Sequence, residues 1–176
     1  ALVVTANPLA SETAHRILLA GGSAVDAAIA AQAVLSVVEP QSSGVGGGGF
    51  LLHFDPASSR AQAYDGRETA PGQAGPDLFL AANGEPLGFV QAVVGGRSVG
   101  VPGLMRMLEL AHAEHGKLPW ASLFEPAIRL AREGFAQSAR LRTLLARERW
   151  LQKDAEALPI YFNAPGQPHP VGYVLR

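Results

Sequence analysis

The residues best suited to chemistry lie in one short segment, Asp65-Gly66-Arg67-Glu68, which follows a predicted strand. Strand ends are common positions for site residues, because the loop exposes groups that the sheet holds rigid. The planar guanidinium of Arg67 could bind a carboxylate through two parallel hydrogen bonds, which a lysine cannot reproduce. The alternative is a salt bridge from Arg67 to Asp65 or Glu68 that serves only the loop. Composition alone favours this second interpretation, since most arginines near acids form solvated surface pairs.

A glycine-rich segment at residues 44–49 matches the pattern G-x-G-x-x-G, and Asp65 follows about 20 residues later, as in dinucleotide-binding proteins. In those proteins the loop leaves a strand and enters a helix, whose amino terminus faces the pyrophosphate. Here a predicted helix leads in and a predicted strand leads out. The Lys-Ser/Thr pair of a phosphate-binding P-loop is also missing. We therefore interpret the glycines as structural residues that allow tight turns and close packing before a buried strand.

Other catalytic chemistries find little support in the sequence. The chain has no cysteine, which excludes a disulfide, a thiolate nucleophile and a cysteine-type zinc site. Its five histidines lack metal-ligand spacing; His112 and His115 lie three residues apart but have no third ligand nearby. We expect no metal and no cofactor. No serine or threonine lies in a recognisable nucleophile motif, so the sequence identifies no nucleophile in this chain.

Composition restricts the class of protein further. The 176 residues are 48% hydrophobic, which is enough for one domain with a core. The 14 basic and 15 acidic residues give a formal net charge of −1, so a nucleic-acid or anionic-membrane surface is not indicated. No apolar run reaches the roughly 18 residues of a membrane span, and the first residues do not resemble a signal peptide.

Capping residues mark the elements that would position this chemistry. Asn7 precedes Pro8, a favoured first helical residue, and Ser23 with Asp26 forms a capping-box variant. The helix after Ser23 is apolar on nearly every face, which predicts burial close against a sheet. Ser138 is expected to cap the last helix. The predicted helices are 8–20, 24–38, 77–81, 102–116, one within 118–133 with Pro126 in its first turn, and 138–150, and the predicted strands are 2–5, 50–54 and 61–65.

The apolar strands 50–54 and 61–65 are too few for a sheet of about five strands, so part of the sheet is expected outside this chain. Several sequence blocks are distinctive when taken together: residues 7–11, 21–28, 38–50, 65–71, 101–103, 116–120 and 126–135. In order and spacing, these blocks resemble the opening of the γ-glutamyltranspeptidase large subunit. Ser23 stands where the family typically has asparagine, and both residues cap helices well.

The resemblance implies an α+β fold, a partial αββα sandwich of the N-terminal nucleophile hydrolases, incomplete in this chain. It implies a proenzyme that cuts itself into two subunits, with a threonine at the new amino terminus of the small subunit as nucleophile. The whole chain, 1–176, would be the N-terminal part of the large subunit. It would comprise a core with the substrate arginine at 1–71, a loop-rich segment at 72–101, a helical segment at 102–157 and a proline-rich end at 158–176.

The resemblance also assigns roles to three residues. Arg67 matches the family arginine that binds the α-carboxylate of the γ-glutamyl group, and Asp65 and Glu68 would hold its guanidinium in place. The implied reaction is hydrolysis or transfer of γ-glutamyl amides such as glutathione. Two alternatives remain open: an acylase of β-lactam side chains or other amides within the family, and a non-catalytic binding module.

The expected partner is the small catalytic subunit from the same precursor, together with a small γ-glutamyl substrate and no nucleic acid. Without that subunit, the chain is expected to be inactive. The family resemblance suggests a periplasmic or secreted location, which the sequence itself does not specify.

Overall fold

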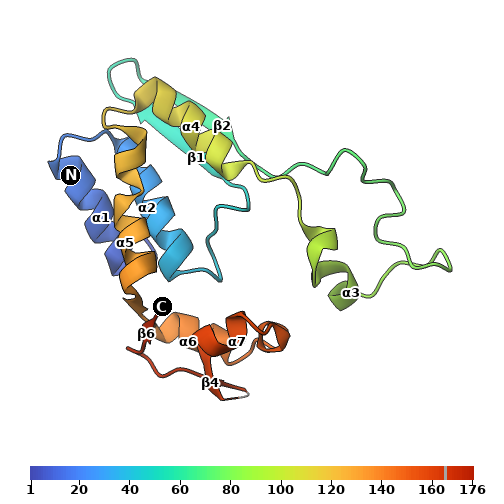
Figure 1. The fold of residues 1–176 in the computed structure, drawn as a ribbon. Helices are drawn as coiled ribbons and strands as arrows, with labels where there is room; N and C mark the ends of the chain where they lie inside the picture. Colours follow the sequence, from blue (N-terminus) through green and yellow to red (C-terminus); the bar gives the residue numbers. More distant parts are fainter. Residues whose placement is uncertain (165) are drawn as a thin grey trace. The chain divides into compact units, whose positions relative to one another are not determined.

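The computed structural model describes residues 1–164 and 166–176 and mixes helices with short strands (Figure 1). The chain forms two compact units, residues 1–45 with 108–176, and residues 46–107. The α-helices are α1 Pro8–Leu19, α2 Ala24–Val38, α3 Phe89–Val93, α4 Leu104–His115, α5 Glu125–Glu133, α6 Ala139–Leu145 and α7 Ala157–Tyr161. The strands are β1 Phe50–Asp55, β2 Arg60–Asp65, β3 Phe135–Ala136, β4 Phe162–Ala164, β5 Gln167–Pro168 and β6 Val174–Leu175. Three 3₁₀ turns are η1 Gly96–Ser98, η2 Trp120–Leu123 and η3 Leu151–Lys153.

Three helices, α1, α2 and α5, form the core of the first unit and lie alongside one another in Figure 1. Both predicted caps are confirmed: the Asn7 side chain accepts a hydrogen bond from the Leu9 N–H, and Ser23 and Asp26 form a complete capping box. The main neighbours of α2 are α1, α5 and η2, and its packing close against a sheet stays a prediction. Small side chains allow these helices to approach closely; the buried core residues are Ala10, Ala14, Ala27, Ala31, Ala33, Val34, Val38 and Ala127.

Asp26 joins the start of α2 to the segment after α4. Its Oδ2 accepts hydrogen bonds from the backbone N–H groups of Ser23 (2.8 Å), Lys117 (2.9 Å) and Leu118 (3.2 Å). Burial alone would raise the pKa of this carboxyl, but the hydrogen bonds outweigh it and hold the pKa of Asp26 below its ordinary value. His112 Nε2 lies 2.9 Å from the Leu118 carbonyl oxygen and 3.5 Å from Asp26 Oδ1. A buried carboxylate therefore fixes a contact across some 90 residues of sequence.

A smaller core forms in the C-terminal part of the first unit. Ser138 caps α6 by accepting a hydrogen bond from the Leu141 N–H, as predicted. The helix ends at Leu145, however, and not near residue 150, and the chain continues through turns to η3. Strand β3 pairs with β6, and β4 with β5, both antiparallel. The buried residues of this core are Leu141, Leu145, Phe162 and Leu175.

The second unit contains an antiparallel hairpin of β1 and β2, in register from Phe50 opposite Asp65 to Asp55 opposite Arg60. Both strands were predicted, but the expected burial of β1 is wrong. Alternate residues of β1 point to the same face, and Phe50, Leu52 and Phe54 are 72%, 73% and 60% exposed. The hairpin thus presents a row of large apolar groups that this chain leaves uncovered.

Two other predicted elements are absent from the structure as described. Residues 2–5 form no strand, and Leu2 and Val4 are exposed. Residues 77–81 form turns in place of a helix, whereas the short helix α3 arises further along. The segment between residues 69 and 101 begins and ends at an isolated antiparallel bridge, Thr69 with Val101. That bridge ties the end of this segment to the turn that carries Arg67.

Candidate functional site

Arg67 lies in a tight turn immediately after β2. The Asp65 carboxylate accepts a hydrogen bond from the Arg67 backbone N–H at 2.9 Å, which bends the chain away from the strand. The Arg67 side chain is 57% exposed, so its guanidinium is accessible to a ligand. Asp65 therefore shapes the turn by binding the backbone of Arg67, whereas the guanidinium has a different acidic neighbour.

That neighbour is Glu68. Arg67 Nη1 lies 3.3 Å from Glu68 Oε2, and the Glu68 side chain is 28% exposed. The geometry of this ion pair falls short of a hydrogen bond, and Oε2 itself is enclosed. A guanidinium has five N–H donors in a planar fork, so one contact with Glu68 leaves several donors for a carboxylate ligand. The ion pair orients the fork but, being largely solvated, adds less than about 1 kcal/mol to stability.

Backbone hydrogen bonds hold this turn from two sides. Gly66 donates to the Gly49 carbonyl at 3.0 Å, and Gly49 donates to the Gly66 carbonyl at 3.2 Å. Beyond Arg67, Thr69 and Val101 exchange hydrogen bonds of 3.3 and 2.9 Å. The glycine-rich segment thus extends the pairing of β1 and β2 up to the residue before Arg67. The position of the arginine backbone is fixed by main-chain pairing, which does not depend on the ion pair with Glu68.

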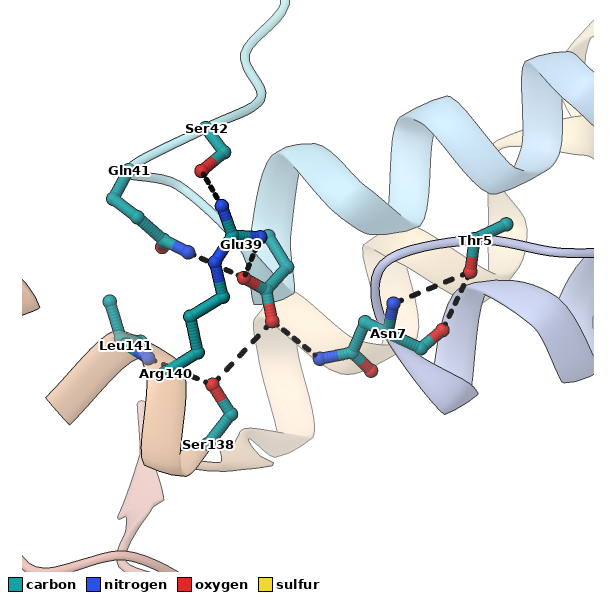
Figure 2. Close-up of polar contacts among 8 residues, drawn as sticks. All are labelled: Thr5, Asn7, Glu39, Gln41, Ser42, Ser138, Arg140 and Leu141. Atoms are coloured by element: carbon teal, nitrogen blue, oxygen red, sulfur yellow. Dashed lines mark hydrogen bonds and ion pairs between the residues drawn. The ribbon is translucent and has the colours of Figure 1, made fainter. Parts of the chain in front are cut away.

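A second polar cluster surrounds Glu39 at the end of α2 (Figure 2), and the sequence interpretation missed it. The Glu39 side chain is 2% exposed. Its carboxylate accepts hydrogen bonds from the side chains of Asn7 (2.9 Å) and Gln41, and lies 3.7 Å from Arg140 Nη1. The Ser138 hydroxyl donates to it at 3.5 Å. One buried carboxylate therefore connects the caps of α1 and α6 to the end of α2.

This cluster contributes to structure, because its enclosed carboxylate holds together the ends of three helices. Its charged partner Arg140 is half exposed and also donates to the Ser42 hydroxyl at 3.1 Å. The cluster fixes residues 39–42 where α2 gives way to the glycine-rich segment. One sequence signal could have revealed this cluster: an acidic residue directly after an all-apolar helix. Burial of an unpaired charge there would cost free energy, so partners are expected.

The described residues include no group of three or more His, Cys, Asp or Glu side chains that could hold a metal ion. Nor does any helix among them have the length and apolar character needed to cross a membrane. The most chemically informative group is therefore the exposed guanidinium of Arg67, held by the turn and faced by one carboxylate. Such a group binds anions and does not itself provide a nucleophile.

Comparison with known proteins gives this arrangement its context. The family model for gamma-glutamyltranspeptidase matches residues 10–176. The chain belongs to the gamma-glutamyltranspeptidase family. A glutathione hydrolase proenzyme of Bacillus subtilis is 45% identical over 134 residues, which cover 76% of this chain and 23% of that protein. The chain thus spans about a quarter of the length of that relative.

Solved structures of the family agree with the fold. The gamma-glutamyltranspeptidase of Helicobacter pylori matches 99% of this chain and 50% of that chain, with a TM-score of 0.91 and 32% identity. A cephalosporin acylase from Bacillus halodurans matches 97% of this chain and 32% of that chain, with a TM-score of 0.74 and 29% identity. The family predicted from the sequence blocks is confirmed, and the relatives named here are enzymes. The names of these two neighbours differ in substrate, so the family alone leaves the substrate open.

Proposed function

We propose that the whole protein of which this chain is part hydrolyses or transfers γ-glutamyl amides such as glutathione, and that Arg67 binds the α-carboxylate of the γ-glutamyl group. The observation that carries the proposal is the exposed guanidinium of Arg67 at the end of β2, fixed by its turn and faced by Glu68. A planar fork in this position suits a planar carboxylate. Asp65 supports the site through the backbone of the turn, and Glu68 through the ion pair.

The bond-breaking step belongs to a residue outside this chain. By resemblance to the family, a threonine hydroxyl at the amino terminus of the small subunit attacks the γ-carbonyl, with its own α-amino group as base. The C–N bond breaks, the amine leaves with a proton, and the γ-glutamyl group remains as an ester on the threonine. Water then releases glutamate, or an acceptor amine forms a new γ-glutamyl amide. Arg67 would hold the donor by its far end, so that the γ-carbonyl meets the nucleophile in a fixed orientation.

The remaining part of the protein, including the small subunit, would complete the αββα sandwich. The uncovered row of Phe50, Leu52 and Phe54 on β1 supports this, because monomeric proteins rarely leave large contiguous apolar patches in water. Both edges of the two-stranded hairpin also lack strand partners among the described residues. We therefore propose that this chain alone is inactive and associates tightly with that part.

The test is turnover of γ-glutamyl-p-nitroanilide by this chain alone and by the same chain produced with the rest of its coding sequence. Activity only in the second case supports the proposal. Activity of the chain alone would mean that it contains a nucleophile that we have not identified. A cooperative thermal transition of the isolated, monomeric chain, with no activity in either case, would favour the non-catalytic binding module.

An acylase is the second candidate, and the structural match to the cephalosporin acylase favours it. Both functions use a carboxylate on the acyl group, but a glutaryl group lacks the α-amino group of a γ-glutamyl group. Comparison of γ-glutamyl and glutaryl p-nitroanilides therefore separates them. A higher kcat/KM for the glutaryl compound would reject the γ-glutamyl assignment and support the acylase.

A further inference from the structure

The glycine-rich segment lies so close to the Arg67 turn that one of its residues has no room for a side chain. A Cβ atom built on Gly48 would lie 2.5 Å from the Gly66 carbonyl oxygen, 2.6 Å from Glu68 Oε2 and 2.8 Å from Arg67 Cα. Two of these three atoms belong to the backbone of the turn, which cannot rotate away as a side chain can. Any residue larger than glycine at this position must therefore displace the turn itself.

A second glycine encloses Glu68 from another segment. A Cβ on Gly100 would lie 2.8 Å from Glu68 Cβ and 3.1 Å from the Thr69 carbonyl oxygen. Gly48 and Gly100 thus both contact Glu68, the acid that faces the guanidinium. The turn that presents Arg67 is held through main-chain hydrogen bonds and is also confined by backbone atoms on both sides.

The neighbouring Gly46 provides a contrast. A Cβ atom on Gly46 would meet no atom within 4 Å. Neither Gly46 nor Gly48 has a positive φ, so an alanine suits the backbone conformation at both positions. The difference between them is only the space beside the Arg67 turn. The absence of a side chain therefore makes room for the Arg67 turn at Gly48 and not at Gly46.

We propose that Gly48 is a positioning residue for carboxylate recognition: the absence of a side chain at Gly48 lets the glycine-rich segment pack on the Arg67 turn and sets the direction of the guanidinium. The inference rests on the proposed function, in which Arg67 binds the donor carboxylate. It goes further because it gives the glycine-rich segment a role in substrate specificity, through Arg67 and Glu68, in addition to its support of β1.

The test compares Gly48→Ala with its matched control, Gly46→Ala, in the whole protein. Two donors are used: γ-glutamyl-p-nitroanilide, and 4-aminobutyryl-p-nitroanilide, which is the same compound without the α-carboxylate. Gly48→Ala is expected to lower kcat/KM for the γ-glutamyl donor about ten- to a hundredfold, mainly through KM, because a charge-assisted contact is lost. It should leave the 4-aminobutyryl donor unchanged, and Gly46→Ala should affect neither. An equal loss for both donors would reduce Gly48 to a structural role and overturn the proposal.

Gly100→Ala approaches Glu68 from the other side and serves as a second variant, with the same selective loss expected. In an Arg67→Ala background, Gly48→Ala should have no further effect on the γ-glutamyl donor, because the residue through which it acts is gone. A full additional loss in that background would contradict the inference.

Hydrogen exchange distinguishes failure of this inference from failure of the proposed function. Gly48→Ala should speed exchange at the Gly66 and Thr69 amides, which are hydrogen-bonded in the turn, and Gly46→Ala should not. If the unmodified protein turns over no γ-glutamyl donor, the proposed function is rejected, while faster exchange would still support the packing. Unchanged exchange in Gly48→Ala would overturn the inference whatever the activity.

Discussion

Replacement of Arg67 by lysine separates the two interpretations of this residue. Lysine keeps the positive charge but binds a carboxylate through a point contact, whereas the guanidinium can make two parallel hydrogen bonds. A hydrogen bond to a charged group contributes about 1.5–3 kcal/mol. The upper value corresponds to a factor on the order of 100 in kcat/KM. The ion pair with Glu68, in which Arg67 is 57% exposed, adds less than about 1 kcal/mol, so little of the effect would come from a weakened turn.

The assay is steady-state turnover of γ-glutamyl-p-nitroanilide by the whole protein, and Arg67→Lys is expected to raise KM. Arg60→Lys is the control, because Arg60 begins the same strand, β2, and lies opposite Asp55 at the far end of the hairpin. The five steps of extended chain from Arg60 to Asp65 span about 17 Å, and Arg67 follows two residues later. Unchanged kinetics in Arg67→Lys, or an equal loss in Arg60→Lys, would refute the assignment of Arg67 to the donor carboxylate.

Three further predictions concern stability and assembly of the whole protein. Asp26→Asn should lower the free energy of unfolding by about 1.5–3 kcal/mol at pH 7, because hydrogen bonds to a charged group are lost. Since the folded-state pKa of Asp26 is depressed, this difference should shrink as pH falls below about 4, measured by denaturant titration. Glu39→Ala should cost about 1–3 kcal/mol, since it leaves the buried Asn7 amide without its acceptor. Glu12→Ala removes an exposed partner of Arg16 and should cost less than about 1 kcal/mol in the same titration. Leu52→Asp should abolish co-purification of separately tagged small subunit, and retention of that subunit would contradict the proposed role of the β1 face.

Local capping chemistry accounts for the parts of the fold that the sequence predicted well. Asn7, Ser23 and Ser138 each bind a backbone N–H two or three residues ahead, so the signal and its effect lie within one helical turn. The hairpin of β1 and β2 was also predicted, because its strands and turn are contiguous in sequence. A short stretch of sequence is therefore enough to predict these elements.

Elements that depend on distant residues were not predictable in the same way. Glu39 binds Asn7 and Ser138, which lie 32 and 99 residues away in sequence. An acidic residue after an apolar helix indicates that a partner is needed, but it does not identify residues so distant. The predicted strand at residues 2–5 has the right composition, but a strand needs a neighbour to pair with, and the described chain supplies none there. The burial of β1 was wrong for the same physical reason: alternation predicts which side chains share a face, and only a partner decides whether that face is covered.

The glycine-rich segment fits the sequence pattern of a dinucleotide-binding loop, but its surroundings differ from those of such a loop. In a dinucleotide-binding loop, the glycines of this pattern allow a pyrophosphate to lie close to the backbone. Here the space beside Gly48 is occupied by the protein's own turn, with Gly66 and Arg67 backbone atoms where a ligand would lie. In both cases the absence of a side chain allows another group to lie close to the glycine backbone. Here the group that approaches is the turn that carries Arg67, and under the proposed function the segment would act on substrate recognition through the position of Arg67.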